Sequence, residues 1–144
     1  MQRAVERMLK AHPEPAIAPS ELLTDCIKAC AECAEVCIAC ADACVADYSP
    51  MLEHCVRLDQ DCADICMTTA RVLSRQSAPD RELVAMQVEL CGAACRACAR
   101  ECGRHGPWHA HCQICAAACE RCAEACLVLV GNRSRDWPSP PRLR

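Results

Sequence analysis

The chain has 144 residues, 18 of them cysteine, with no Phe, 2% aromatic residues and a formal net charge of −3. The length suits one domain, and the small negative charge supplies no basic field for nucleic acid. No apolar run approaches the ~20 residues of a membrane span, so we expect no membrane partner. Residues 1–20 contain neither a continuous apolar segment nor a twin-arginine pair, and a cytoplasmic protein is therefore expected.

Helical signals begin near the N-terminus. Val5, Met8 and Leu9 recur at helical spacing, which predicts a short amphipathic helix over residues 3–11, before the proline-rich stretch 12–19. A first long helix is predicted from a cap at Ser20 to about residue 47. A second is predicted from Ser49 and the following proline to about residue 75.

Two more long helices are predicted in the second half of the chain. The third opens within residues 77–79 and closes within residues 103–107, and the fourth runs from about Pro107 to Gly131. Short connections between long helices imply antiparallel neighbours. We therefore predict an all-α protein: a lead over residues 1–19, an antiparallel four-helix bundle over 20–131 and a flexible, mobile tail over 132–144.

The cysteines follow the register of a helical core. Most of them are three or four residues apart, the rhythm that keeps side chains on one stripe of a helix. Thiols therefore replace the leucines of an ordinary bundle. The candidate metal ligands are Cys26, Cys30, Cys33, Cys37, Cys40, Cys44, Cys55, Cys62, Cys66, Cys91, Cys95, Cys98, Cys102, Cys112, Cys115, Cys119, Cys122 and Cys126.

Three interpretations of so many thiols compete with metal storage. Buried cysteine can act as a small apolar filler, but no packing argument prefers it to Leu or Ala at every layer. A disulfide framework is disfavoured in a reducing cytosol, and residues four apart on a helix hold their Cβ atoms too far apart for one. A thiol redox enzyme or metal sensor would need one distinguished thiol, and no isolated nucleophile is recognisable.

The pairing of the sulfurs indicates the metal. Each CxxxC unit is a two-sulfur clamp, and a near-linear S–metal–S unit spans ~4.5 Å, within reach of residues four apart on a helix. Linear binding by two thiolates is typical of Cu(I). Bridging thiolates filled with about one monovalent ion each are nearly neutral, whereas Cys₄ zinc sites would bury about −2 each. Iron–sulfur clusters need a looped ligand run that a straight helix does not provide.

Antiparallel packing gives the two ends of the bundle different chemistry. We expect one end to be sealed by an aliphatic plug of Leu22, Leu23, Val72, Leu73, Leu83, Val84, Leu127 and Leu129. The other end, here called the mouth, collects soft and borderline metal ligands. It comprises Tyr48, Met51, His54, Cys55, His105, His109, His111 and Cys112.

Several mouth residues are candidate ligands beyond the cysteines. His105, His109 and His111 flank a turn beside cysteines, and His54 adjoins Cys55. Met51 precedes Cys55 by four residues and is either a thioether ligand or, as we favour, a core methionine. An acid, Asp59, occupies a core position between Cys55 and Cys62. Either it hydrogen-bonds a thiol, accepts a proton or contacts an ion, or a local stutter turns Leu58 inward instead.

The motifs CIKACAECAEVCIACADAC, CADIC, CGAACRACAREC and CQICAAACERCAEAC resemble those of the copper storage proteins, over about residues 20–130. The resemblance implies a cysteine-lined four-helix bundle that stores many Cu(I) ions, assembles as a homotetramer and has no catalytic turnover. Without an export signal, the chain looks like the cytosolic branch. Copper is then expected to arrive at the mouth by ligand exchange from a copper chaperone or a small thiol, and the alternatives of a zinc, iron–sulfur or sensor protein remain open.

Overall fold

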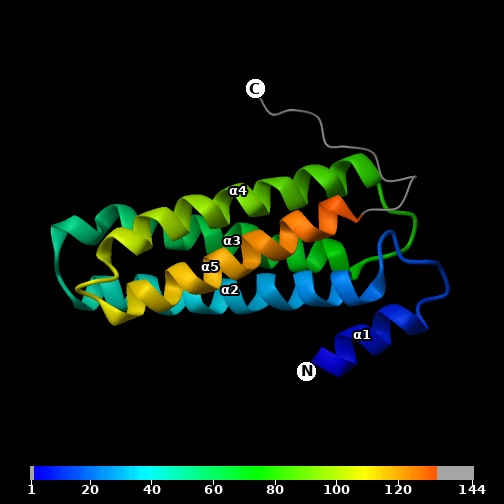
Figure 1. The fold of residues 1–144 in the computed structure, drawn as a ribbon, viewed down its shortest axis with the longest axis horizontal. Coiled ribbons are helices and arrows are strands. Elements are labelled where there is room, and N and C mark those ends of the chain that lie inside the picture. Colours follow the sequence, from blue (N-terminus) through cyan, green and yellow to red (C-terminus); the bar gives the residue numbers. More distant parts are fainter. Residues whose placement is uncertain (1, 133–144) are drawn as a thin grey trace.

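The computed structural model describes residues 2–132, and in this range all the regular secondary structure is helical (Figure 1). None of the described helices is both long enough and apolar enough to cross a membrane. The elements are α1 (Gln2–Ala11), α2 (Ser20–Ala46), the 3₁₀ turn η1 (Pro50–Leu52), α3 (Glu53–Ser74), α4 (Arg81–His105) and α5 (Ala110–Gly131). The short first helix and the four long ones predicted from the sequence are confirmed.

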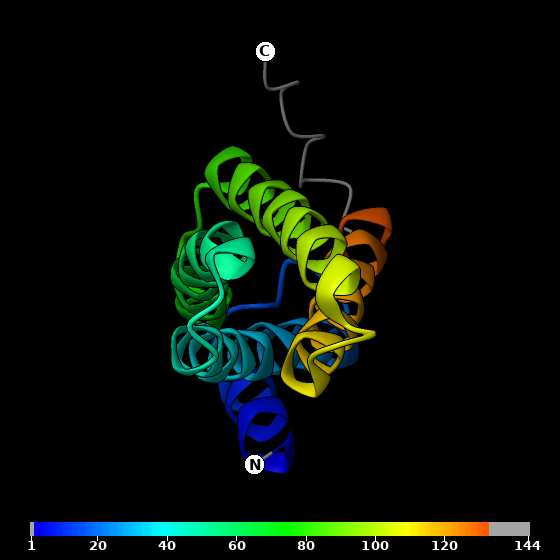
Figure 2. The same cartoon turned by 90° about the vertical axis from the view of Figure 1, so that its left-hand side faces the viewer.

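The four long helices form an antiparallel bundle that encloses a single core. Figure 2 looks along the bundle and shows α2, α3, α4 and α5 arranged as a ring of four. Contacts join α2 to α3, α3 to α4, α4 to α5 and α5 back to α2, so the ring is closed. Helix α1 packs on the outside of the bundle against α2. The core is therefore a column that runs lengthwise between four helices.

Helix boundaries differ slightly from the sequence prediction. Asp80, rather than residues 77–79, opens α4, because its side chain accepts a hydrogen bond from Leu83 N at 3.0 Å. Helix α5 begins at Ala110 and not at Pro107. The backbone N–H of residue 109 still bonds to His105 O at 3.0 Å, which extends the preceding turn and delays the new helix.

The sulfurs form the core of the bundle. Every cysteine is buried and carries a free thiol, so no disulfide crosslinks the helices. Alanines at the flanks of the cysteine stripe are also buried, among them Ala34, Ala63, Ala85 and Ala116. These small side chains let neighbouring helices approach closely enough for the thiols to meet across the axis.

The closed end is aliphatic, as expected, but its composition differs. Leu23, Leu73 and Leu129 are fully buried. Leu83 and Leu127 were wrongly assigned to the plug, because they lie on the outer faces of their helices and are 59% and 64% exposed. Ile17, from the segment that precedes α2, is buried at this end, where Leu83 and Leu127 had been expected.

The segment between α1 and α2 crosses the loop that joins α3 to α4. The Ile17 N–H donates to Gln76 Oε1 at 3.4 Å, and the Ala78 N–H donates to Glu14 Oε2 at 3.0 Å. These bonds fasten the lead over the aliphatic end, which is thereby closed to solvent. Of the predicted tail, residues 133–144 lie outside the described part of the chain, so its predicted mobility stays a prediction.

Candidate metal centre

The CxxxC pairs place sulfur atoms at metal-bridging distance along α2, α3 and α4. The Sγ atoms of the pair Cys62 and Cys66 lie 3.8 Å apart. Three other pairs have separations of 3.9 Å: Cys33/Cys37, Cys40/Cys44 and Cys98/Cys102. Two sulfurs that share a metal at ~2.3 Å lie ~3.8–4.6 Å apart, depending on the bond angle. The helix geometry alone therefore prepares two-sulfur clamps, with little rearrangement needed.

Sulfurs from different helices are equally close. Cys33 Sγ lies 3.7 Å from Cys119 Sγ, and Cys66 Sγ lies 3.5 Å from Cys95 Sγ. The shortest separation, 3.1 Å, joins Cys55 to Cys102 near the mouth. Each clamp thus has further sulfurs within reach on neighbouring helices, and the thiols form one continuous network.

The network contains overlapping sets of four potential ligands. Such sets, whose ligand atoms lie within 4.8 Å of one another, include Cys30/Cys91/Cys122/Cys126, Cys33/Cys37/Cys62/Cys119, Cys33/Cys62/Cys66/Cys95 and Cys37/Cys98/Cys115/Cys119. Four cysteines each belong to two of these sets, namely Cys33, Cys37, Cys62 and Cys119, so the sets cannot all be filled as independent four-coordinate sites. Sharing of sulfurs between metals is built into the arrangement.

Asp59 lies inside the column, where it interrupts the thiols of α3. It is fully buried, and its Oδ1 accepts hydrogen bonds from Cys98 and Cys115 at 3.2 Å and from Cys102 at 3.4 Å. The stutter that would turn this residue outward is therefore excluded. Burial, with the nearby Cys115 as a second cause, raises the pKa of Asp59 to about 8. Its carboxyl group is consequently protonated at neutral pH.

One histidine of the mouth joins the thiols directly. His111 Nδ1 lies 3.5 Å from Cys40 Sγ, 3.5 Å from Cys112 Sγ and 3.9 Å from Cys44 Sγ. The four residues form a further set of potential ligands with one nitrogen and three sulfurs. The ring's Nε2 donates to Asp47 Oδ2 at 2.7 Å. An imidazole nitrogen is thus aimed at the outermost sulfurs.

Three other candidate ligands of the mouth, His105, His54 and Met51, differ from His111 in their surroundings. His105 is buried, and its Nε2 lies 3.5 Å from Glu101 Oε1 without a hydrogen bond. His54 is solvent-exposed. The prediction of a core methionine is wrong, because Met51 is 74% exposed while the next residue of the 3₁₀ turn, Leu52, is buried in its place.

The thiols of Cys44 and Cys112 are protonated in the metal-free protein. Burial is the main cause that raises the pKa of Cys44 above its ordinary value, and it raises the pKa of Cys112 to about 11. In both cases charge on the neighbouring Cys55 acts in the same direction. A metal that binds these sulfurs must therefore displace protons.

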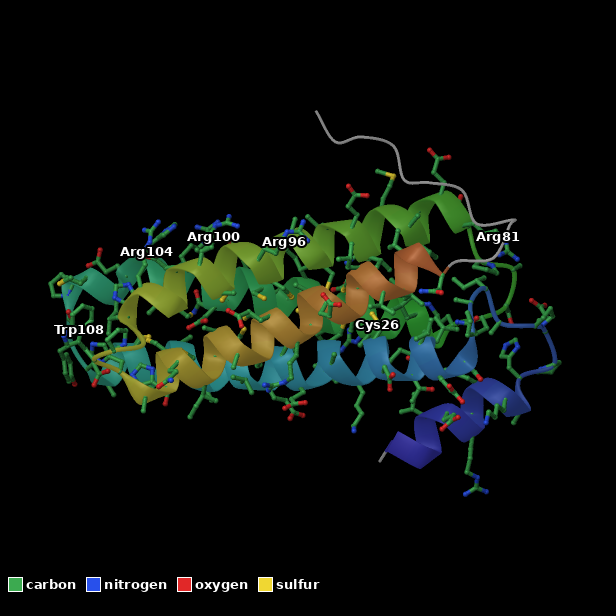
Figure 3. All side chains as sticks on the ribbon, viewed as in Figure 1. Cys26, Arg81, Arg96, Arg100, Arg104 and Trp108 are labelled. Carbon is green, nitrogen blue, oxygen red and sulfur yellow. The ribbon has the colours of Figure 1, made fainter. Side chains whose placement is uncertain are left out.

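Sequence reasoning missed Asp47, which contacts two mouth histidines. Its Oδ2 lies 2.7 Å from His111 Nε2 and 2.9 Å from His109 Nδ1. The sequence feature that could have pointed to Asp47 is its place at the end of the first long helix, three residues beyond Cys44. In Figure 3, Trp108 marks this mouth end, and Arg81 marks the opposite, closed end.

Comparison with known proteins gives a consistent result. A family model described as Copper storage protein matches residues 20–131. The copper storage protein Ccsp of Streptomyces lividans, in a structure loaded with 10 copper equivalents, is 39% identical with a TM-score of 0.84, over 89% of this chain and 98% of that chain. The Cu(I)-bound copper storage protein of Bacillus subtilis is 38% identical with a TM-score of 0.64, over 72% and 93%. No curated protein matches the sequence.

Proposed function

The chain belongs to the copper storage protein family, and we propose that its thiol column stores Cu(I) at roughly one ion per cysteine. As a member of this family it is a metal store and not an enzyme. The observation that carries the proposal is the continuous sulfur network, with separations such as 3.5 Å for Cys66/Cys95 and 3.9 Å for Cys33/Cys37. We propose all 18 cysteines as ligands, and residues 20–131 as the storage domain.

Charge and connectivity favour Cu(I) over zinc. If every thiolate bridges two monovalent ions, about one ion per sulfur leaves the interior nearly neutral. Four separate Cys₄ zinc sites would bury about −2 each. The overlapping sets that share Cys33, Cys37, Cys62 and Cys119 also suit bridging ligation better than separate tetrahedral sites.

Copper enters, on this proposal, at the mouth. The closed end is sealed by buried leucines and by the lead segment fastened over them. At the mouth, His111 Nδ1 and three sulfurs provide a first set of soft and borderline ligands. Ligand exchange with a copper chaperone or a small thiol delivers Cu(I) there. Asp59, beside Cys55 and Cys102, is the next polar group inward, and His54, His105, His109 and Met51 remain outer candidates.

We further propose that the protein acts in the cytosol as a homotetramer. A Streptomyces lividans relative, 42% identical over 79% of this chain and 96% of that chain with a TM-score of 0.75, is described as a cytosolic copper storage protein loaded with five coppers. The free thiols of this chain suit a reducing compartment. Sedimentation of the reduced protein with and without copper tests the assembly, and a monomer at all loadings would contradict it.

The decisive experiment is an anaerobic titration of the fully reduced protein with Cu(I). Thiolate-to-copper absorbance and metal analysis after gel filtration should show saturation near one ion per cysteine, with zinc unable to match it. Saturation at four or fewer ions would overturn the proposal and indicate a discrete cluster or a sensor. Peroxide treatment distinguishes a copper store from a redox protein, since a redox protein would contain one thiol that reacts far faster than the rest.

The route of uptake needs its own variants. Replacing Cys55 by Ala together with the mouth histidines should slow both loading and extraction of copper. Replacing the buried Leu129 of the closed end by Ala is the matched comparison, because it loosens the other end without removing a ligand. If copper loading and extraction rates are unchanged in the mouth variant but altered in the Leu129→Ala variant, copper enters at the closed end, which would contradict the proposed route.

A further inference from the structure

Asp47 contacts two histidines at the mouth through opposite nitrogens of their rings, and it accepts a hydrogen bond from His111 Nε2. Its Oδ2 lies 2.7 Å from His111 Nε2 and 2.9 Å from His109 Nδ1. The two ring centroids are 5.5 Å apart, and the rings are tilted by 48°. Both histidine side chains are about three-quarters buried, so the contact is a defined one between partly enclosed groups.

A carboxylate fixes the tautomers of both rings. An ionised carboxylate only accepts hydrogen bonds, so each nitrogen that faces it must carry the proton. In neutral imidazole, the opposite nitrogen then holds the lone pair. In His111 this nitrogen is Nδ1, which faces Cys40 and Cys112 at 3.5 Å. In His109, whose Nδ1 faces the carboxylate, it is Nε2.

We propose that Asp47 is the positioning residue of copper uptake, holding His111 and His109 in opposite tautomers so that two metal-binding nitrogens are ready before copper arrives. The inference rests on the proposed storage of Cu(I) and deepens it. Carboxylate partners of this kind commonly orient metal-binding histidines and raise their basicity. A Cu(I) ion that binds His111 Nδ1 meets a lone pair and displaces no proton from that ring.

The place of Asp47 in the fold argues against a merely structural role. It is the C-cap residue of α2, with its backbone N–H bonded to Ala43 O at 3.1 Å. A negative charge at the C-terminus of a helix opposes the helix dipole and disfavours the folded state. An aspartate is ordinarily ionised at neutral pH, and this one is nevertheless kept at the helix end, 2.7 Å from His111 Nε2. A charge that is unfavourable for the helix, yet is kept beside two histidines, indicates that Asp47 acts on these histidines.

The test compares the Asp47→Ala variant with the wild type and with Asp42→Asn, which changes an exposed acid on the same helix. In the metal-free protein at pH 8, nitrogen-15 shifts of the rings should report Nε2–H for His111 and Nδ1–H for His109. In the Asp47→Ala variant each ring should become a mixture of tautomers. Cu(I) transfer from a chelator, followed by stopped flow, should slow at least about tenfold, with the final capacity unchanged.

The conservative variant and the controls separate the outcomes. Asp47→Glu keeps the carboxylate and should restore part of the rate, whereas Asp42→Asn should match the wild type throughout. Unchanged tautomers in Asp47→Ala, or an unchanged transfer rate with altered tautomers, would overturn the inference while leaving storage intact. A wild type that fails to take up Cu(I) would instead refute the proposed function. Circular dichroism should show equal helix content, because Asp47 is a partly exposed residue at a helix end.

Discussion

Replacement of Asp59 by Asn should remove a pH dependence from the unfolding of the metal-free protein. The Asp59 carboxyl group is fully buried, and its pKa is raised to about 8 by burial and by the nearby Cys115. Its Oδ1 accepts hydrogen bonds from three thiols, whereas Oδ2 faces Cys55 Sγ at 3.9 Å. The amide of Asn reproduces the protonated acid: its oxygen can keep the three bonds, and its NH₂ can face Cys55.

The sign and size of the effect follow from the two pKa values. In the unfolded chain an aspartate titrates near 3.9, so between pH ~4 and ~8 the native wild type holds a proton that the unfolded state has lost. Raising the pH through this window therefore destabilises the wild type, and below pH ~4 the effect vanishes. The full linkage is about 1.4 kcal/mol per pH unit. Solvent screening and relaxation reduce it, and we expect about 2 kcal/mol between pH 5 and pH 7.

The assay is urea unfolding of reduced, metal-free protein under anaerobic conditions at pH 5, 6 and 7. Only the difference between the wild type and the Asp59→Asn variant is used, since the titration of every other group then largely cancels. Asp64→Asn, which changes an exposed acid on the same helix, is the control and should leave the pH dependence of the wild type intact. A stability difference between wild type and Asp59→Asn that stays constant over this range, or that favours the wild type increasingly at high pH, would refute a protonated Asp59.

Three further predictions concern the column and its closed end. Leu129→Ala should lower the free energy of unfolding by about 2–4 kcal/mol, whereas Leu127→Ala, 64% exposed on the same helix, should change it by less than ~0.5 kcal/mol in the same urea assay. Replacing Cys33 and Cys37 by Ala should reduce copper capacity by on the order of two ions per chain, measured by metal analysis; an unchanged capacity would exclude these sulfurs as ligands. Loading at pH 7 should release on the order of one proton per thiol bound, read by an indicator dye in weak buffer, because Cu(I) binds thiolates and must displace the proton of each protonated thiol, such as Cys112, whose pKa is raised to about 11; absence of proton release would mean that the thiols start as thiolates.

The sequence alone determined the fold class and the chemistry of the core. Steps of three and four residues place side chains on one face of a helix whatever surrounds it, so the cysteine stripe could be read before any helix was packed. The same local geometry predicted the sulfur pairs within a helix, such as Cys62/Cys66 at 3.8 Å. The softness of thiolates and the charge of a filled column then indicated Cu(I).

Local periodicity was less informative about residues at the edge of a stripe. Leu83 and Leu127 are apolar neighbours of core positions, yet both lie on the outer surface. A helical turn does not divide evenly into the heptad, so the inward face drifts along a helix, and the packing of the partner helices decides which flanking residue is covered. Met51 was misplaced for a related reason, since a 3₁₀ turn presents the next residue to the core.

Only the tertiary structure decided which groups meet across the bundle. The contact of Asp47 with His111 joins residues 64 positions apart, and the thiols that donate to Asp59 Oδ1 come from α4 and α5. Such contacts depend on the rotation of each helix about its axis and on its offset along the column. Both are set by the packing of all four helices together, and no spacing within one helix encodes them.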